Sequence, residues 1–265
     1  MLTDRPTPLK RLTDTELLVL LLAGDSEEAP WMVMSDFQWR VVDLLMSILH
    51  LYAQRRALPW YLSAEINVFM PAPVSGRALP VVPDLFMAEA EDRERTSWRV
   101  AEEGPPLFAL EVVSEESRQR DLEEKPALYD TMGVRELAIF DPHRRDGGPA
   151  LFGYRRGEAA AFVPWTVDAQ GTLWSETLGL GLYRAAGDRL RVRDRTGVVL
   201  PSSEEEAARA EAEAIRAEKE AARAEAEAIR AEEGAARAEA EARRADVAEA
   251  ELARLRARLD QQGQG

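Results

Sequence analysis

Two acidic residues and a lysine stand out because their types suit phosphodiester chemistry. Asp84 follows Pro83 in one short apolar run, and Glu111 is embedded in the next apolar run. Lys125 is the single lysine between residues 11 and 200. A metal ion held by carboxylates, with an ammonium group beside it, is suited to the hydrolysis of phosphate esters. These three residues are therefore the first candidates for a catalytic site.

Asp84 and Glu111 have the chemistry of magnesium ligands. Mg²⁺ takes oxygen ligands, keeps several waters, and is usually held by one or two carboxylates together with substrate phosphate. Two neighbouring carboxylates also repel each other, which favours a cation between them. We therefore expect Mg²⁺ or Mn²⁺ at Asp84 and Glu111, and we expect Lys125 to stabilise the charge that develops on the phosphate.

Two predicted strands would bring the acids together. The run 107–113 is apolar apart from Glu111, which is typical of a strand buried on both faces, and a lone acid inside it needs a partner. A second short strand is predicted at 81–87, where Pro83 is best tolerated at an edge or near the start. If the two strands are neighbours, Asp84 and Glu111 converge.

The sequence from 83 to 142 resembles the Uma-two family of endonucleases, which belongs to the PD-(D/E)xK nuclease superfamily. The motifs that carry the resemblance are Pro83-Asp84, Glu111-Val-Val-Ser114, Arg120-Asp121-Leu-Glu-Glu-Lys125, Ala127-Leu-Tyr129, Gly133-Val-Arg-Glu136 and Phe140-Asp141-Pro142. The likeness extends over about residues 13 to 200. It implies a restriction endonuclease-like fold and a Mg²⁺-dependent endonuclease that hydrolyses DNA.

The sequence departs from the superfamily pattern in two places. The superfamily lysine usually lies two positions after the acid, where this chain has Val113. The resemblance therefore implies that the lysine has moved to the following helix, as Lys125. The chain has Ser114-Glu115-Glu116-Ser117 where the family commonly has Ser-Pro-Ser-Thr, and the negative charge of the two glutamates would oppose the approach of phosphate.

Each candidate also has a purely structural interpretation. Glu111 and Lys125 could form a buried ion pair without any catalytic role. Asp121, three residues before Glu124, matches a helix N-cap with a capping-box partner, and this interpretation is favoured over a functional one. Glu65 lies in an alternating apolar segment, where it is either a third metal ligand or an exposed glutamate on a strand.

A second hypothesis comes from a different class of function. The chain could be a catalytically inactive nuclease fold that acts as an interaction module through its C-terminal helix. Val113, in place of the usual lysine, is the feature that favours it. Catalysis needs near contact, so a Lys125 ammonium more than about 8 Å from both carboxylates would support this hypothesis.

Other chemistries find little support in the composition. The chain contains no cysteine, which excludes thiol catalysis, disulfides and zinc–thiolate sites and suits a reducing cytoplasm. It shows no nucleophile elbow, Walker loop or dinucleotide-binding motif. The apolar stretch 17–23 is too short to span a bilayer, so no membrane partner is expected.

The overall pattern predicts a mixed α/β fold, in which a restriction endonuclease-like mixed sheet is flanked by helices and extended by antiparallel strands. Helices are expected at 12–23 and from Ser35 or Asp36 to about Tyr52, where apolar residues recur at helical spacing. Further strands are expected at 136–140, 151–154, 160–163, 178–182 and 190–192.

The composition changes sharply after residue 201, so 1–200 and 203–262 are predicted to be separate domains. Three copies of a 14-residue Ala/Glu/Arg-rich unit predict one long helix, and they occupy 207–220, 221–234 and 235–248. With Ala212 at heptad position a and Ile215 at d, arginines fill the e positions and glutamates the g positions. This charge pattern predicts a parallel coiled coil and a homodimer. Because alanine dominates the seam, a solitary helix held by its own ion pairs is an equal alternative.

The chain is acidic, with a formal net charge of −14 at pH 7. Residues 1–202 alone contain 31 acidic and 23 basic residues. Duplex binding normally uses a basic face, so affinity for long DNA is expected to be modest and sensitive to salt. The arginines expected to form a local basic patch are Arg118, Arg120, Arg144 and Arg145.

Overall fold

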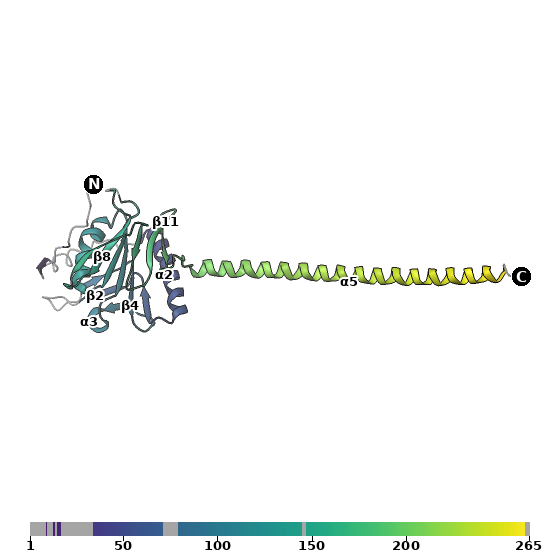
Figure 1. Ribbon diagram of the computed structural model, residues 1–265. Coiled ribbons are helices and arrows are strands. Elements are labelled where there is room, and N and C mark those ends of the chain that lie inside the picture. Colours follow the sequence, from purple (N-terminus) through teal and green to yellow (C-terminus); the bar gives the residue numbers. More distant parts are fainter. Residues whose placement is uncertain are drawn as a thin grey trace. The chain divides into compact units, whose positions relative to one another are not determined.

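The computed structural model describes residues 9, 13, 15–16, 34–70, 79–144 and 147–262. The chain divides into two compact units, Met1–Glu204 and Glu205–Gly265. The first unit contains the β-sheets and the second consists of the long helix α5 (Figure 1). The helix expected at 12–23 lies almost entirely outside the described residues.

The main sheet of the first unit has six strands in the order β1-β4-β6-β7-β8-β9. Its strands are β1 (Trp60–Ser63), β4 (Leu85–Glu89), β6 (Phe108–Val112), β7 (Glu136–Phe140), β8 (Leu151–Arg156) and β9 (Phe162–Thr166). The pair β6 and β7 is parallel, and each of the other neighbouring pairs is antiparallel. The prediction of a mixed α/β fold with a mixed sheet and an antiparallel extension is therefore confirmed.

One face of the main sheet is covered by helix α2 (Asp36–Arg56) and by a three-stranded antiparallel sheet. That sheet contains β10 (Thr172–Trp174), β11 (Gly181–Ala185) and β12 (Arg189–Arg193). Helix α2 begins at the N-cap Ser35, whose side chain and that of Gln38 form a capping box. Its buried residues recur at intervals of three and four, so one stripe of the helix packs on the sheet.

The opposite face carries a second core. A small sheet packs there, formed by β2 (Asn67–Met70), β3 (Leu79–Val81) and β5 (Ser97–Arg99), and the short helix α3 (Val100–Glu103) follows β5. The same core includes residues of helix α4 (Lys125–Met132), which directly continues the π-helical turn η1 (Arg120–Glu124). Strand β6 is thus covered on both sides, as its apolar sequence requires.

The predicted strand at 81–87 and the alternating segment around Glu65 are each divided in the structure. The segment 81–87 is split between β3 and β4, which belong to different sheets, because Pro83 has no amide hydrogen to donate to a strand partner. The segment 61–70 is split between β1 and β2 by a turn in which Glu65 has a left-handed backbone conformation, with φ of 54°. Strand β7 matches its predicted bounds, and β10 was not predicted.

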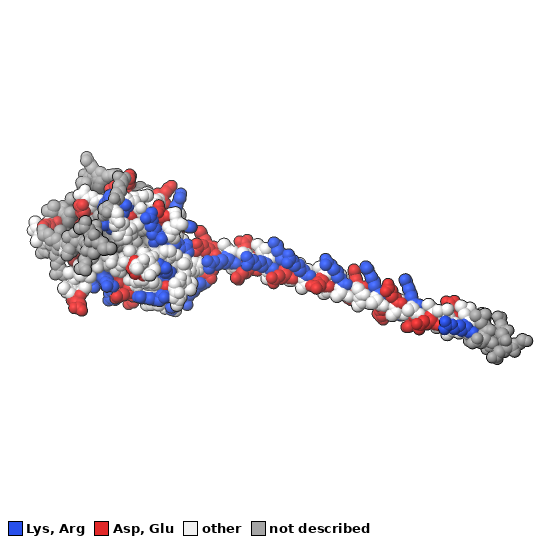
Figure 2. Space-filling model, turned by 45° about the horizontal axis from the view of Figure 1, so that its top comes forward, with Lys and Arg blue, Asp and Glu red and all other residues white. Residues whose placement is uncertain are grey.

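Helix α5 (Ser203–Gln262) has 60 residues and covers all three repeat units. Gly234 lies within the continuous helix. The large apolar side chains on it are exposed, including Ile215 and Ile229. Basic and acidic side chains alternate along its surface (Figure 2). Among the described helices, none is long and apolar enough to cross a membrane.

Candidate active site

Asp84 directly precedes strand β4, and Glu111 lies on β6, the strand that pairs with β4 in the main sheet. Strands β4 and β6 are paired so that Leu85 lies opposite Leu110, and one further step along this antiparallel register places Asp84 opposite Glu111. Residues on either side of Glu111 belong to the core under α2, whereas Glu111 itself points to the face covered by α4. The convergence expected from the two apolar runs is therefore present.

Glu111 is fully buried and has a partner on each carboxylate oxygen. The ammonium nitrogen of Lys125 donates a hydrogen bond of 2.6 Å to Oε2. The hydroxyl of Tyr129 donates one of 2.5 Å to Oε1. These contacts explain how an acid can be tolerated inside the most apolar strand of the chain. They also place Lys125 far inside the separation of about 8 Å that would count against catalysis.

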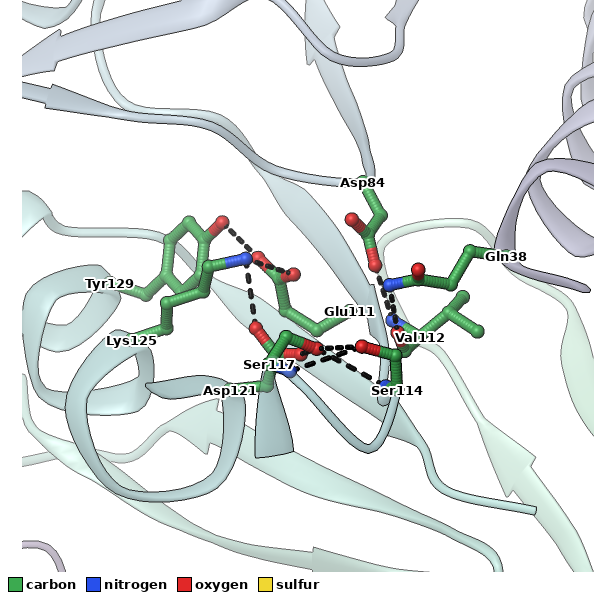
Figure 3. A network of polar contacts seen from close by, with 9 residues as sticks. All are labelled: Gln38, Asp84, Glu111, Val112, Ser114, Ser117, Asp121, Lys125 and Tyr129. Atoms are coloured by element: carbon green, nitrogen blue, oxygen red, sulfur yellow. Dashed lines mark hydrogen bonds and ion pairs between the residues drawn. The ribbon is translucent and has the colours of Figure 1, made fainter. Parts of the chain in front are cut away.

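Lys125 also makes an ion pair with Asp121, in which Nζ lies 2.9 Å from Oδ1. Asp121, Lys125 and Tyr129 are spaced four residues apart, so that one side of the η1 and α4 segment presents all three to Glu111 (Figure 3). This spacing is visible in the sequence, and it is the signal that could have identified Asp121 and Tyr129 as members of the site.

The prediction that Asp121 is a helix N-cap is wrong. The backbone already turns before this residue, because Asp121 N–H donates to the carbonyl of Ser117 at 2.9 Å. Ser114 and Ser117 exchange hydrogen bonds between their side chains and amides, and so perform the capping. The Asp121 side chain is instead buried, where Oδ2 accepts a hydrogen bond from the Ser117 hydroxyl.

The Val112 peptide group is held by two side chains from distant parts of the chain. Its N–H donates to Asp84 Oδ2 at 2.6 Å, and its carbonyl accepts from Gln38 Nε2 at 2.7 Å. Strand β4 begins after Asp84, so these side chains replace the strand partner that Val112 lacks on that side. Gln38 was missed from the sequence because a glutamine in a helix capping box already has a local explanation.

Burial and charge shift the pKa values of the site. Desolvation raises the pKa of Asp84 to about 6, although Lys125 and the Val112 amide oppose the shift. Desolvation likewise raises the pKa of Glu111, against the opposing charge of Lys125. Burial alone would lower the pKa of Lys125, but the carboxylates of Glu111, Asp121 and Asp84 outweigh it and raise that pKa. Burial, followed by the Glu111 charge, raises the pKa of Tyr129.

The site carries more negative than positive charge. Asp84, Glu111 and Asp121 are buried carboxylates, and Lys125 is the buried ammonium among them. A cation would relieve this imbalance, because buried charges are costly unless they are paired or bound to a metal. The excess of buried acid is the electrostatic feature that distinguishes this cluster from a simple one-to-one ion pair.

The oxygen atoms of Asp84 and Glu111 fit a hard divalent cation. Asp84 Oδ2 is occupied by Val112, while Oδ1 accepts no hydrogen bond from the described residues. Each Glu111 oxygen retains a further lone pair beyond its one hydrogen bond. Two carboxylates, completed by water and phosphate oxygens, are a usual Mg²⁺ environment. Within the described ranges, no group of three acidic, histidine or cysteine side chains is arranged to hold a metal ion, so a cation here would have two protein carboxylates as ligands.

Glu65 lies at the margin of this cluster. Its side chain is exposed at the turn between β1 and β2, and its N–H donates to the carbonyl of Pro83, the residue before Asp84, at 3.2 Å. Its negative charge helps to raise the pKa of Asp84, and it is the smallest contribution to that shift. Glu65 is therefore near the site without being brought into a three-carboxylate group, and its role as a third ligand stays a prediction.

The expected basic patch is only partly present in the described residues. Arg118 forms a two-pronged ion pair with the buried Asp141, with N–O distances of 3.1 and 2.5 Å, so its charge is locally neutralised. Arg144 lies over the ring of Phe152. Arg145 falls outside the described residues. A patch built from these arginines would thus provide less net positive charge than their number suggests.

Comparison with known proteins identifies a family and similar solved structures. The family model described as "Uma2: Putative restriction endonuclease" matches residues 23–187. A crystal structure of a "putative nuclease belonging to DUF820" from Anabaena variabilis matches with 10% sequence identity and a TM-score of 0.41, and covers 55% of this chain and 75% of that chain. No curated protein matches the chain.

Proposed function

The chain belongs to the Uma2 family, described as restriction endonucleases, and from this premise we propose that it is a metal-dependent DNA endonuclease. The family predicted from the sequence motifs is confirmed, and a nuclease is the activity that the family indicates. The metal dependence, the DNA substrate and the assignment of residues to roles are our proposals. They are supported by the site geometry described above.

The observation that carries this proposal is the contact between Lys125 and Glu111 beside Asp84. The ammonium lies 2.6 Å from Glu111, and Asp84 stands immediately before β4, at the position that continues its register to Glu111. This contact supports a role for Lys125 in phosphodiester hydrolysis, even though the residue comes from a helix. A lysine at Val113 is not required to bring an ammonium to this point.

Each residue has a distinct proposed role. Asp84 and Glu111 would hold Mg²⁺ or Mn²⁺, which when bound polarises phosphate and lowers the pKa of water. Lys125 would donate to a non-bridging phosphate oxygen and stabilise the charge that develops there. Tyr129, by donating to Glu111 Oε1, fixes the orientation of that carboxylate within the sheet. Glu65 would act as a third ligand through a water molecule at the exposed side.

A basic hairpin supports the proposal that the partner is nucleic acid. Residues 181–196 include β11, β12 and the turn after them, and they contain five arginines against two aspartates. The guanidinium of Arg193 lies over Tyr183, and that of Arg195 lies over Trp174. Such stacking holds the exposed Arg195 while leaving its N–H groups able to meet phosphate, whereas the Arg193 guanidinium already donates to Thr172. This locally basic segment lies within an acidic chain.

Helix α5 is proposed to join two copies of the chain as a parallel coiled coil in the cytoplasm. The exposed Ile215 and Ile229 are two heptads apart and share the d position, and the e and g charges are opposite. Two nuclease units held by one coil could act on both strands of a duplex. The printed ion pairs within α5, such as Arg243 with Glu239, equally fit a solitary helix.

Nicking of supercoiled plasmid at low salt tests the activity. We expect cleavage with Mg²⁺ or Mn²⁺ that is abolished by EDTA and reduced about 100-fold or more in Asp84→Ala, Glu111→Ala and Lys125→Ala. Asp130→Asn is the matched control. Asp130 is a buried aspartate of α4 that accepts a hydrogen bond from the Phe162 N–H and forms an ion pair with Arg156, without contact to the proposed site.

Two results would reject the nuclease. A folded native protein that leaves the plasmid intact would favour the interaction module, in which α5 provides the function. Cleavage that survives all three substitutions would assign the activity to another site or to a contaminant.

A further inference from the structure

Asp121 is a buried acid that the proposed roles of Asp84, Glu111 and Lys125 leave unexplained. Its side chain is 1% exposed, although it lies on a short helical turn near the surface of the fold. Burying a third carboxylate beside two others costs free energy, because their charges repel and water is lost. A structural pair between Lys125 and Glu111 would be neutral by itself, so stability alone does not account for Asp121.

Asp121 contacts the ammonium of Lys125 as a second carboxylate besides Glu111 (Figure 3). The distances from Nζ are 2.6 Å to Glu111 Oε2 and 2.9 Å to Asp121 Oδ1. The contact with Oδ1 is an ion pair without hydrogen-bond geometry, so it can tighten if the ammonium moves toward Asp121. The Asp121 carboxylate is thus a second anionic partner that can hold the Lys125 ammonium.

The anchor itself is held in place. Asp121 Oδ2 accepts the hydroxyl of Ser117, and this hydroxyl lies 2.8 Å from that of Ser114, at the loop that follows β6. The Asp121 carboxylate is therefore fixed by the loop next to the strand that carries Glu111. A side chain fixed on one oxygen, with its other oxygen directed at an ammonium, is arranged to orient that ammonium.

We propose that Asp121 is a positioning residue, which keeps the Lys125 ammonium in the site when the Glu111 carboxylate binds a divalent cation. The proposal rests on the function proposed above. A carboxylate that binds a cation attracts a neighbouring ammonium less strongly, and without a second anchor Lys125 would be released from its position. Asp121 keeps the ammonium beside Asp84 and Glu111, where a phosphate oxygen would meet it.

The central test needs no metal and no activity. Glu111→Gln removes the negative charge that attracts Lys125, and so imitates a Glu111 carboxylate whose charge is neutralised by a bound cation. The chain has only three lysines, so ¹⁵Nζ and ¹³Cε labelling of lysine gives three sets of NMR signals, and Lys125→Met identifies the set from Lys125. The signal position and the order of this side chain report directly on how it is held.

We expect the Lys125 signals to remain distinct and ordered in Glu111→Gln, and to move to the positions of exposed, mobile lysines in Glu111→Gln/Asp121→Asn. Asp130→Asn, combined with Glu111→Gln, is the control and should leave the Lys125 signals ordered. Ser117→Ala, in the Glu111→Gln background, is the milder variant that loosens Asp121 without removing its charge, and it should increase Lys125 mobility to an intermediate extent.

Either of two results would overturn the proposal. Lys125 could become mobile in Glu111→Gln alone, which would mean that Asp121 does not anchor it. Lys125 could also remain ordered in the Asp121 double variant and in the Ser117 variant, which would mean that other contacts hold it. Failure of plasmid nicking would reject the nuclease while leaving this NMR result to decide the role of Asp121.

Cleavage then separates positioning from metal binding. In a nicking-active protein, Asp121→Asn should lower the cleavage rate at saturating Mn²⁺ by about 10-fold or more, while its Mn²⁺ affinity, measured by electron paramagnetic resonance, stays within about threefold of native. Glu111→Gln should lower both. Loss of Mn²⁺ affinity in Asp121→Asn equal to that in Glu111→Gln would make Asp121 a ligand and contradict the positioning role.

Discussion

Lys125 donates to Glu111 across fourteen residues of sequence, and both side chains are buried, with Nζ 2.6 Å from Oε2. The same ammonium contacts Asp121, and Asp84 lies opposite Glu111 in the sheet. A purely structural ion pair would need one acid for one base. The excess of carboxylates around a single ammonium is what a site built to receive a cation requires.

Acidification should stabilise the metal-free protein. The pKa of Asp84 in the folded protein is about 6, raised from an ordinary value of about 4, so the folded state binds more protons between these values. Stability therefore falls as pH rises from about 4 to 6, by at most about 3 kcal/mol from this group, and levels off above that range. Urea denaturation in EDTA at pH 4.5 and 7.5 measures the change.

Asp84→Asn isolates this contribution, because the amide oxygen can still accept from the Val112 N–H. The variant should be more stable than native at pH 7.5, by about 1 to 3 kcal/mol, and nearly equal to native at pH 4. A variant that is destabilised by the same amount at both pH values would show that Asp84 is not a strained, buried acid in the free protein.

Removing the Lys125 ammonium alone should lower the free energy of unfolding more than removing it together with the Glu111 charge. Lys125→Met leaves the carboxylates of Glu111 and Asp121 buried without a base, which should cost about 3 to 5 kcal/mol of unfolding free energy. In Lys125→Met/Glu111→Gln one of those charges is absent, so the double variant should lose less than the sum of the single losses. Urea denaturation of the native protein, Lys125→Met, Glu111→Gln and the double variant completes the double-mutant cycle. Additive losses of stability would argue against direct coupling between Lys125 and Glu111.

A single methyl group should disrupt the main sheet at Gly153. This residue of β8 lies opposite Ala138, and an added Cβ would fall 2.0 Å from the carbonyl oxygen of Leu137, a backbone atom that cannot move aside. Gly153→Ala should therefore cost about 3 kcal/mol or more. Gly234→Ala is the contrasting control, because a Cβ there meets nothing within 4 Å and should raise helicity by circular dichroism.

The coiled-coil interpretation of α5 predicts a concentration-dependent dimer. Sedimentation of the native chain should show dimers that are lost in Ile215→Glu/Ile229→Glu, because charge is placed in the apolar seam. Ala214→Glu/Ala228→Glu adds the same charge one residue away, at heptad position c, and should leave the dimer intact. A native chain that remains monomeric at all concentrations would support the solitary helix instead.

The sequence predicted the elements that bear the candidate residues better than it predicted their connections. Apolar runs located β6 and β7, and helical spacing located α2, since burial patterns follow directly from these periodicities. The division of 81–87 could not be predicted in this way, because a proline can begin a strand or separate two. The turn at Glu65 was equally hidden, since it depends on a left-handed residue that is not glycine.

Asp121 shows most clearly why the rest of the site could not be predicted. Its local sequence satisfies a capping rule, and only the tertiary structure shows that Ser114 and Ser117 already perform the capping. The role of Gln38 could not be predicted for the same reason, because its contact with Val112 joins residues 74 positions apart. Local rules assign one role to each residue, whereas a buried site recruits residues by their position in three dimensions.

Mn²⁺ binding to the native chain and to Asp84→Asn, followed by electron paramagnetic resonance, tests the central claim most directly. The account predicts one ion per chain in the native protein, an affinity lower by about tenfold or more in Asp84→Asn, and native affinity in Asp130→Asn. Equal affinity in all three proteins, or no bound ion in any of them, would contradict a cation site at Asp84 and Glu111.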